Sequence, residues 1–362
     1  MDFSAAGLPR NITHAYLEVY IKGNGCDEQW FTDVPNDVAA QFPSAGMCGN
    51  GPYREVDAAI DGQLAGVTQY FPYIYTGGIA PTLWRPIPAV GTLDMAPELI
   101  DVTPFVGQLV DGGSHAFALT AANAGDVWNL SANLLLYTDH GATTTSGALT
   151  KDTIAPTAVM SEKDTTGTDG SVTANVGATR NWTTSGYVIT SAGKETTTVT
   201  QNMAYDNVDV VSQGGFAQNL TETDKGQNVS VTTNGRGSKQ IDTHQWSYPI
   251  SVQYAYQEPD ASSFSIDATV NMTRQLQDSQ STNRAPGDRT AELAPSRAAS
   301  QSNDQVWSTA TFAVTDGTLT GASGQAWQNY AGTDDVPGQW YEHYLAATNG
   351  YVTADRLHVL GR

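Results

Sequence analysis

The sequence at residues 14–21 is HAYLEVYI, a run in which successive side chains alternate in character. Four aliphatic residues fall on one face of an extended chain: Ala15, Leu17, Val19 and Ile21. Tyr16, Glu18 and Tyr20 fall on the other face. A period of two is typical of a β-strand with one buried face. This stretch therefore predicts a half-buried strand.

The same pattern continues on both sides of the dipeptide Asp61-Gly62. Residues 53–60 and 63–67 flank it, and an Asp-Gly pair between two such runs predicts a β-hairpin. Further strands are predicted at residues 99–102, 116–120 and 128–137. No long amphipathic helix is predicted, and only residues 34–40 have the pattern of a short helical turn.

The composition changes after residues 139–141. Residues 146–169 are rich in Thr, Ser, Gly and Ala and are predicted to form a linker. A second β-rich region follows over residues 170–362, with strands predicted at 172–176, 186–190, 196–205, 229–233, 250–256, 264–272, 307–314, 339–346 and 351–360.

Residues 275–304 interrupt this second region with Ser, Gln, Pro, Arg and Ala, and they contain almost no large apolar side chain. This composition predicts a disordered insertion rather than a packed loop. The whole pattern predicts an all-β protein with two β-sandwich domains, at about residues 10–145 and 165–362. The second domain is not necessarily independent of the first.

The charge of the chain is strongly acidic. Its 362 residues include 17 Lys and Arg against 37 Asp and Glu, which gives a formal net charge of −20. Such a surface repels phosphate backbones and argues against a nucleic-acid partner. It suits an acidic medium, where protonation relieves the repulsion. No apolar run approaches the roughly 20 residues that a membrane-spanning helix needs, so no membrane partner is expected.

Cysteines and glycosylation sequons favour an oxidising compartment. Cys26 and Cys48 lie in Gly-rich sequence, which favours a disulfide over the alternative of two unpaired buried thiols. Six Asn-X-Ser/Thr sequons occur, which indicates a secreted glycoprotein, although a chain rich in Thr, Ser and Asn forms some by chance. They are at Asn11, Asn129, Asn181, Asn219, Asn228 and Asn271. The first residues have neither the basic nor the apolar part of a signal peptide.

Several common chemistries are not indicated. The sequence has no HExxH, paired CxxC, GxSxG, phosphate-binding loop or dinucleotide fingerprint. Its six histidines are scattered and lack the spacing of metal ligands. No metal site is therefore predicted.

The most informative stretch for chemistry is residues 23–31, GNGCDEQWF. It places Asp27 and Glu28 in a loop after a strand, close to Trp30. A carboxyl group packed near an aromatic ring is partly desolvated, which raises its pKa and allows it to act as an acid. The alternative interpretation is a solvated acidic turn.

A second candidate group combines charged and aromatic side chains. Arg54 and Glu55 form one part, and Trp84 and Arg85 form another. Sugar recognition uses aromatic rings that stack on C–H faces, together with charged groups that bind hydroxyls. The alternative is that the aromatic side chains fill the interior.

These stretches together resemble the peptide-N-glycosidase A family. The resemblance runs colinearly through residues 8–140 and thins beyond residue 150. It rests on LPRN at 8–11, YLEVY at 16–20, DEQW at 27–30, GPYREV at 51–56, IDG at 60–62, FP at 71–72, YTGGI at 75–79, WRP at 84–86, IDVTPF at 100–105 and ANL at 132–134.

The resemblance implies a jelly-roll module over residues 1–145, the linker at 146–169 and a C-terminal β-rich domain at 170–362. It implies hydrolysis of the amide between N-acetylglucosamine and asparagine in N-glycopeptides, at acid pH and without metal or organic cofactor. It also implies a secreted, vacuolar or extracellular protein. A Cys-x-Glu-Trp stretch in a distantly similar bacterial family maps the catalytic glutamate onto Glu28. The implied substrate-binding residues are Asp27, Trp30, Arg54, Glu55, Trp84 and Arg85.

One departure from the family pattern affects activity. The family supplies its principal catalytic aspartate from a module that precedes the one seen here, and that module is expected to act in cis or as a separate chain. The alternatives are therefore an inactive or glycan-binding fragment or homologue, and a glycoside hydrolase with two carboxylates.

Overall fold

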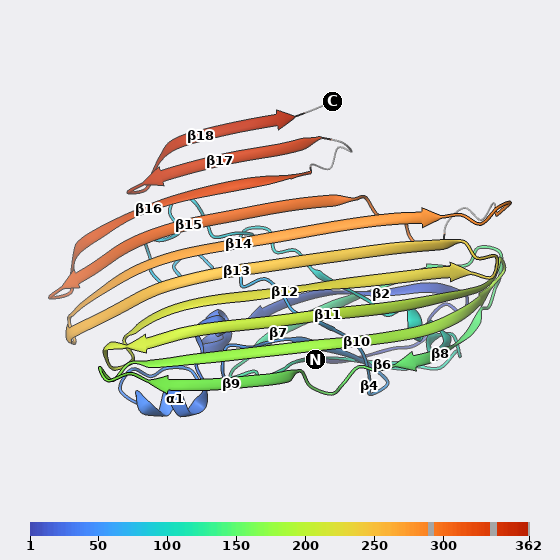
Figure 1. Ribbon diagram of the computed structural model, residues 1–362, viewed down its shortest axis with the longest axis horizontal. Coiled ribbons are helices and arrows are strands. Elements are labelled where there is room, and N and C mark those ends of the chain that lie inside the picture. Colours follow the sequence, from blue (N-terminus) through green and yellow to red (C-terminus); the bar gives the residue numbers. More distant parts are fainter. Residues whose placement is uncertain (289–292, 334–338, 361–362) are drawn as a thin grey trace.

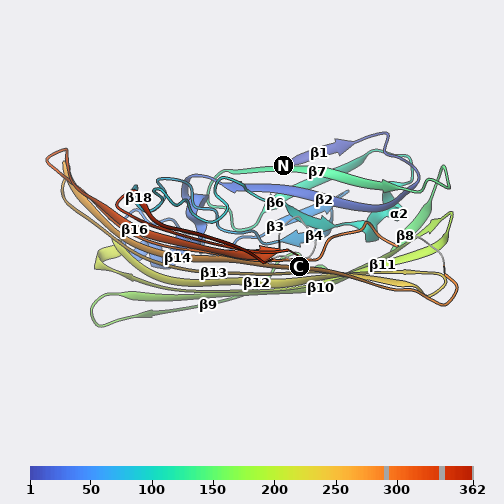
Figure 2. The same ribbon diagram turned by 90° about the horizontal axis from the view of Figure 1, so that it is seen from above.

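The computed structural model describes residues 1–288, 293–333 and 339–360. The fold is all-β, as predicted, and it consists of one very large sheet with an N-terminal module packed on one face (Figure 1). Figure 2 shows that the large sheet is curved, with its concave face toward the module, and that the hairpins at one end extend past the module. Among the described residues no helix is long and apolar enough to span a membrane.

The N-terminal module contains two small antiparallel sheets. The first has the order β1-β6-β3-β4, with β1 at Asp2–Ala5, β6 at His115–Ala121, β3 at Val56–Ile60 and β4 at Gln63–Thr68. The second has the order β5-β2-β7, with β5 at Glu98–Asp101, β2 at Ile12–Gly23 and β7 at Trp128–Thr138. The predicted hairpin is confirmed, because Asp61 and Gly62 both have positive φ, at 52° and 81°, and connect β3 to β4.

Helices are short in the described chain. They are η1 at Gly25–Thr32, α1 at Asn36–Gln41, η2 at Thr103–Phe105, α2 at Val106–Leu109 and η3 at Gln213–Gly215. The short helical turn predicted at residues 34–40 corresponds to α1. The helix η1 contains a kink at Gln29, where φ is −132°.

The C-terminal region forms one eleven-stranded antiparallel sheet. Its strands are β8 at Ser146–Asp152, β9 at Val159–Thr166, β10 at Val172–Thr190, β11 at Gly193–Ser212, β12 at Ala217–Asn234, β13 at Lys239–Asp260, β14 at Ser263–Asn283, β15 at Ser300–Thr315, β16 at Thr318–Thr333, β17 at Trp340–Thr348 and β18 at Tyr351–Leu360. From β10 to β18 the strands follow one another as a meander.

The prediction of a second sandwich is wrong, because this region is a single sheet whose inner face is covered by the module. One continuous core joins residues of both layers, such as Leu17 and Phe71 of the module and Ile250 and Val270 of the large sheet. The module and the sheet therefore fold against each other. The division into a module at 1–145 and a domain at 170–362 stays a prediction.

Two segments that were expected to lack regular structure contain strands. The predicted linker at 146–169 contains β8 and β9, which both pair with β10. The predicted disordered insertion at 275–304 contains the end of β14 and the start of β15. Both predictions are wrong for these strands; residues 289–292 lie outside the described chain.

Polar side chains that form hydrogen bonds across strands explain why residues 275–304 were wrongly predicted to be disordered. Asp278 bonds His244 of β13 at 2.7 Å and accepts a hydrogen bond from Ser300 at 2.8 Å. The Gln280 amide donates to Asp242 at 2.6 Å. Cross-strand pairs of this kind stabilise a sheet without large apolar residues. A hydrophobicity pattern does not detect them.

Buried carboxyl groups lie between the module and the large sheet. Glu222 of β12 is 4 % exposed and accepts hydrogen bonds from the Tyr205 hydroxyl at 2.5 Å and the Asn207 amide at 3.0 Å. Burial raises the pKa of Glu222 to about 7, even though these two donors lower it. Burial likewise raises the pKa of Asp209 to about 6.

We expect the free energy of unfolding to be larger at pH 4.5 than at pH 7.5. A carboxyl with a raised pKa in the folded state stabilises that state below its unfolded pKa, and the contribution is lost as pH rises through the folded value. For Glu222 the loss between pH 4.5 and 7.5 is about 3 kcal/mol. Thermal unfolding at the two pH values measures it.

The Glu222→Gln variant is the matched control for this pH effect. Its amide oxygen still accepts from Tyr205 and Asn207, but it does not titrate. The pH dependence of unfolding should therefore become flatter in the variant. A wild type that is equally stable at both pH values, or a variant with an unchanged slope, would contradict this account.

Candidate functional site

The loop after β2 is fixed by a disulfide and by backbone hydrogen bonds. Cys26 of η1 is bonded to Cys48, so the predicted bridge is confirmed and the alternative of free thiols is excluded. The Val34 amide donates to the Cys48 carbonyl at 3.0 Å, and the Gly51 amide donates to the Val34 carbonyl at 3.0 Å. These connections present the carboxylates of η1 at a defined place.

Asp27 is buried beneath η1. Its side chain is 0 % exposed and accepts hydrogen bonds from both Nε and Nη2 of Arg54, at 2.9 and 2.5 Å. The Trp128 indole and the backbone amides of Gly125 and Asp126 each donate to it at 2.7 Å. Burial alone would raise the pKa of Asp27, but these donors outweigh it and hold the pKa below its usual value. Asp27 and Arg54 thus form a structural ion pair rather than an exposed sugar contact.

A second carboxyl group shares the same arginine. Asp33 Oδ2 lies 2.7 Å from Arg54 Nη2 and is almost completely buried. Burial raises the pKa of Asp33 to about 8, although Arg54 lowers it. The pKa values of the two aspartates around Arg54 are therefore shifted in opposite directions, that of Asp27 downward and that of Asp33 upward.

Glu55 joins the module to the large sheet. It is 1 % exposed, accepts from the Tyr53 hydroxyl at 2.6 Å, and forms an ion pair with Arg180 of β10. Arg180 also donates to the Ala155 carbonyl at 2.6 Å. The side chain of Glu55 is fully occupied between the two layers, so it does not face a groove.

The tryptophans predicted to contact substrate are core residues. Trp30 is 5 % exposed and packs on Tyr70 with ring centroids 4.5 Å apart. Trp84 is 3 % exposed and donates from its indole to the Gly78 carbonyl at 3.0 Å. Arg85 is exposed, but it does not line the groove that contains Glu28.

Glu28 is the predicted site residue that faces an open groove. The groove has a volume of about 550 Å³ and lies between η1, the disulfide and the adjacent ends of β12 and β13. Glu28 is exposed on the side of the groove that the module forms. The side that the large sheet forms carries Tyr254, Tyr256 and Glu258. The groove therefore has a carboxylate on each side and aromatic rings on its sheet side.

A row of aromatic rings leads out of this groove across the strands. Ring centroids are 6.3 Å apart between Phe216 and Tyr256, 6.0 Å between Tyr256 and Phe264, and 5.9 Å between Phe264 and Phe312. All four rings are half-buried. Tyr256 lies an even number of residues from the buried Val252, so it shares the inner face of the sheet. We call these four residues the aromatic row.

Sequence reasoning missed the aromatic row and Glu258. Tyr254 and Tyr256 stood in a strand that was predicted, and their spacing of two placed both on one face. What the sequence did not show is that this end of the strand meets η1, more than 200 residues earlier in the chain.

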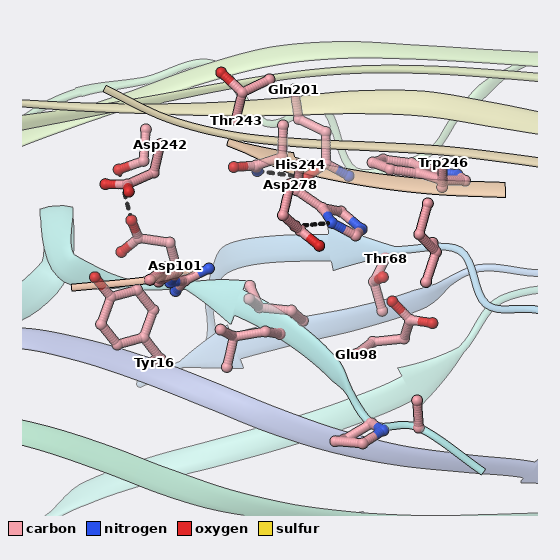
Figure 3. Close-up of a pocket in the computed structure, with 18 of the residues that line it drawn as sticks. Tyr16, Thr68, Glu98, Asp101, Gln201, Asp242, Thr243, His244, Trp246 and Asp278 are labelled. Atoms are coloured by element: carbon pink, nitrogen blue, oxygen red, sulfur yellow. Dashed lines mark hydrogen bonds and ion pairs between the residues drawn. The ribbon is translucent and has the colours of Figure 1, made fainter. Parts of the chain in front are cut away.

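A second, more enclosed hollow lies further along the interface between module and sheet (Figure 3). It has a volume of about 380 Å³, and Glu98, Asp101, His244, Trp246 and Asp278 are among its lining residues. None of the catalytic or substrate-binding residues predicted from the sequence lines it, although the sequon residue Asn228 does.

One group of three carboxylates within the described residues comes close enough together to share a cation. Oxygens of Asp37, Glu162 and Asp164 lie within 4.8 Å of one another. Two of these residues are exposed, and surface groups of this kind are common without an ion. The absence of a metal requirement stays a prediction.

The sequons differ in their surroundings. Asn129, Asn181 and Asn219 are exposed. Asn11, Asn228 and Asn271 are half-buried and hydrogen-bonded. Asn228 faces the inner side of the sheet, where its amide donates to Gln201 at 2.9 Å. Glycosylation of all six stays a prediction.

The groove of Glu28 combines the kinds of side chain that carbohydrate-binding sites use, because rings stack on sugar C–H faces while carboxylates accept from hydroxyls. Comparison with known proteins gives the family. Residues 2–155 match the family described as peptide N-acetyl-beta-D-glucosaminyl asparaginase amidase A, and residues 173–250 match the PNGase A C-terminal domain. The chain belongs to the peptide-N-glycosidase A family.

One curated relative extends the comparison. The chain is 38 % identical over 211 residues to peptide-N4-(N-acetyl-beta-glucosaminyl)asparagine amidase A of Prunus dulcis. The match covers 58 % of this chain and 37 % of that relative, so the chain spans well under two thirds of the relative's length. No solved structure matches the chain.

Proposed function

We propose that the chain forms the glycan-facing part of an amidase that hydrolyses the bond between N-acetylglucosamine and asparagine in N-glycopeptides. The observation that carries the proposal is the groove in which Glu28 and Glu258 flank the start of the aromatic row. The membership of the family and the name of the almond relative agree with this substrate.

The proposed chemistry needs a group that directs water and a group that protonates the leaving nitrogen. Water adds to the amide carbon of the asparagine side chain, the carbon–nitrogen bond breaks, and aspartate and a glycosylamine result. We propose that Glu28 hydrogen-bonds the reacting part of the substrate and takes part in its proton transfer, and that the aromatic row holds the sugars that follow. A further module, in cis or as a separate chain, is proposed to supply the principal catalytic aspartate.

The proposed setting is an acidic secreted or vacuolar compartment. The disulfide between Cys26 and Cys48 is compatible with an oxidising environment. The buried carboxyl groups Asp209 and Glu222 favour the folded state at acid pH, as argued above. The net charge of −20 also favours the folded state at acid pH, because protonation of carboxylates relieves their mutual repulsion.

Mass spectrometry of a defined N-glycopeptide, incubated at acid pH with the chain together with the module that supplies the aspartate, tests the proposed reaction. An amidase converts the glycosylated asparagine to aspartate and releases the intact glycan. A glycoside hydrolase would leave N-acetylglucosamine on asparagine, because it cuts a sugar–sugar bond. A glycopeptide that binds but remains intact would identify a non-catalytic glycan-binding protein instead.

Replacing Tyr256 by alanine is expected to weaken binding of the N-glycopeptide about tenfold, which corresponds to about 1.4 kcal/mol. Tyr256 is the ring that joins Phe216 in the groove to Phe264 outside it, and its removal interrupts the stacking surface. Isothermal titration calorimetry measures the change. Tyr256→Phe keeps the ring and should bind nearly as wild type does.

Tyr351→Ala is the matched control, because Tyr351 is 78 % exposed at the start of β18 and does not line the groove. It should leave the affinity unchanged. Equal losses in Tyr256→Ala and Tyr351→Ala would argue against a role for the aromatic row.

A further inference from the structure

The enclosed hollow of Figure 3 lies between the module and the inner face of the large sheet. Glu98 comes from β5 on the module side, and His244 and Asp278 come from β13 and β14 on the sheet side. Gln218 of β12 lines the groove of Glu28, and Asn228 of the same strand lines the hollow. Ten residues of extended strand separate them by about 33 Å, so the two sites are distinct.

Three aspartates of the hollow are already engaged in hydrogen bonds. Asp101 accepts from the Ser230 hydroxyl at 2.7 Å and from a backbone amide at 2.9 Å. Asp242 accepts from Gln280 at 2.6 Å, and Asp278 is bonded to His244 Nδ1 at 2.7 Å. These hydrogen bonds fix the aspartates in the wall of the hollow.

Three other polar groups lack such partners within the described residues. Glu98 forms no hydrogen bond or ion pair with any described side chain, although it lines the hollow. Arg274 forms no ion pair with a described carboxylate, and its Nε is buried without a hydrogen-bond partner. His244 uses Nδ1 for Asp278 and leaves Nε2 free. Of these three groups, only Arg274 has a fully buried atom without a partner, its Nε, while Glu98 and His244 are half-buried. Because buried polar atoms normally have partners, Arg274 Nε and the two free groups beside it point to a ligand.

An aromatic wall lies beside these three groups. The rings of His244 and Trp246 are stacked, with centroids 5.6 Å apart and planes 25° from parallel. The Trp246 ring lies against the backbone at Gly226, where an added Cβ would meet the ring at 2.2 Å. Trp246 also donates from its indole to Asp224 at 3.2 Å. The aromatic wall is thus fixed from two sides.

We propose that this hollow is a second ligand site that binds a neutral pyranose saccharide, with Glu98 and His244 accepting from its hydroxyls, Arg274 donating to them, and the stacked rings covering one sugar face. The lining combines four acidic residues with two arginines, Arg274 and Arg297, so hydrogen-bond acceptors and donors both face the hollow. A neutral polyhydroxyl ligand satisfies donors and acceptors alike.

Binding of N,N′-diacetylchitobiose and of methyl α-mannoside to the Tyr256→Ala chain tests the proposal, because this variant weakens the groove of Glu28. Saturation-transfer NMR and calorimetry should show one neutral saccharide binding with a Kd of about 1 mM. Arg274→Met in the same background should weaken binding at least fivefold. Arg85→Met removes an exposed arginine outside the hollow and should not change it.

Several results would overturn the second site. They are the absence of saccharide binding to the Tyr256→Ala chain, binding that Arg274→Met does not change, or tighter binding of glucosamine or glucuronate than of the neutral sugars. If Arg274→Met does not fold as judged by thermal unfolding, Glu98→Gln provides the same test, with an expected loss of at least threefold. Failure of the proposed function is a separate result, because it appears as equal glycopeptide binding by wild type and Tyr256→Ala.

Discussion

Replacing Glu28 by glutamine is expected to slow conversion of the N-glycopeptide by about 100-fold to 10,000-fold, the range typical of a residue that takes part in proton transfer. The amide keeps the size of the side chain but cannot accept a proton. Glu28 is exposed in the groove, so the change should leave stability unaltered. Mass-spectrometric counting of aspartate-containing peptide over time measures the rate.

Glu18→Gln is the matched control for this experiment. Glu18 lies on β2, where it accepts a hydrogen bond from Asn133 at 2.8 Å, and it does not line the groove. The same chemical change there should leave the rate within twofold of wild type. If Glu28→Gln retained full activity while Tyr256→Ala lost it, the groove would be the substrate site, but Glu28 would take no part in catalysis.

Arg54→Met should destabilise the folded protein by about 3–5 kcal/mol, because it leaves the buried carboxyl groups of Asp27 and Asp33 without their cation. Methionine fills most of the volume of the arginine stem, so the loss is electrostatic rather than steric. Chemical denaturation at pH 6 measures the free energy of unfolding.

Two further variants distinguish the stability lost with the ion pair from the stability lost with side-chain packing. Arg85→Met removes an exposed arginine and should change the stability by less than about 0.5 kcal/mol. Adding Asp27→Asn and Asp33→Asn to Arg54→Met should recover part of the loss, since no unpaired charge then remains. A stable Arg54→Met protein that had lost glycopeptide binding would instead restore Arg54 to the substrate-binding role predicted from the sequence.

The strand pattern around residues 14–21 predicted its buried face correctly. Ala15, Leu17, Val19 and Ile21 are at most 4 % exposed. Tyr16 on the opposite face is buried too, because residues of the C-terminal region cover it and the Arg297 guanidinium lies 4.9 Å from its ring. Such burial depends on contacts nearly 300 residues away, which no local periodicity contains.

The large sheet was only partly predictable. The strand β16 at Thr318–Thr333 was missed because small residues such as Gly324 occupy its inner face. Gly324 is required there, since an added Cβ would lie 2.9 Å from the Thr82 carbonyl of the module. The hydrophobic pattern that reveals an ordinary strand is therefore weak in this one.

The candidate site was also predictable only in part, because the local sequence does not show how distant parts of the fold pack together. The stretch at 26–30 identified the loop, the disulfide and Glu28. It could not show that Asp27 turns inward to Arg54, because the orientation of neighbouring side chains in a kinked helix depends on the packing beneath it. It also could not supply the aromatic row, which belongs to the other layer of the fold.

The N-glycopeptide is proposed to bind where η1 meets the ends of β12 and β13. Hydrogen–deuterium exchange of the Glu28→Gln chain, with and without saturating N-glycopeptide, tests this location directly. Bound glycopeptide should slow exchange at residues 25–33, 214–218 and 254–258, which form both sides of the groove. Unchanged exchange in these three segments, with protection elsewhere on the chain, would contradict it.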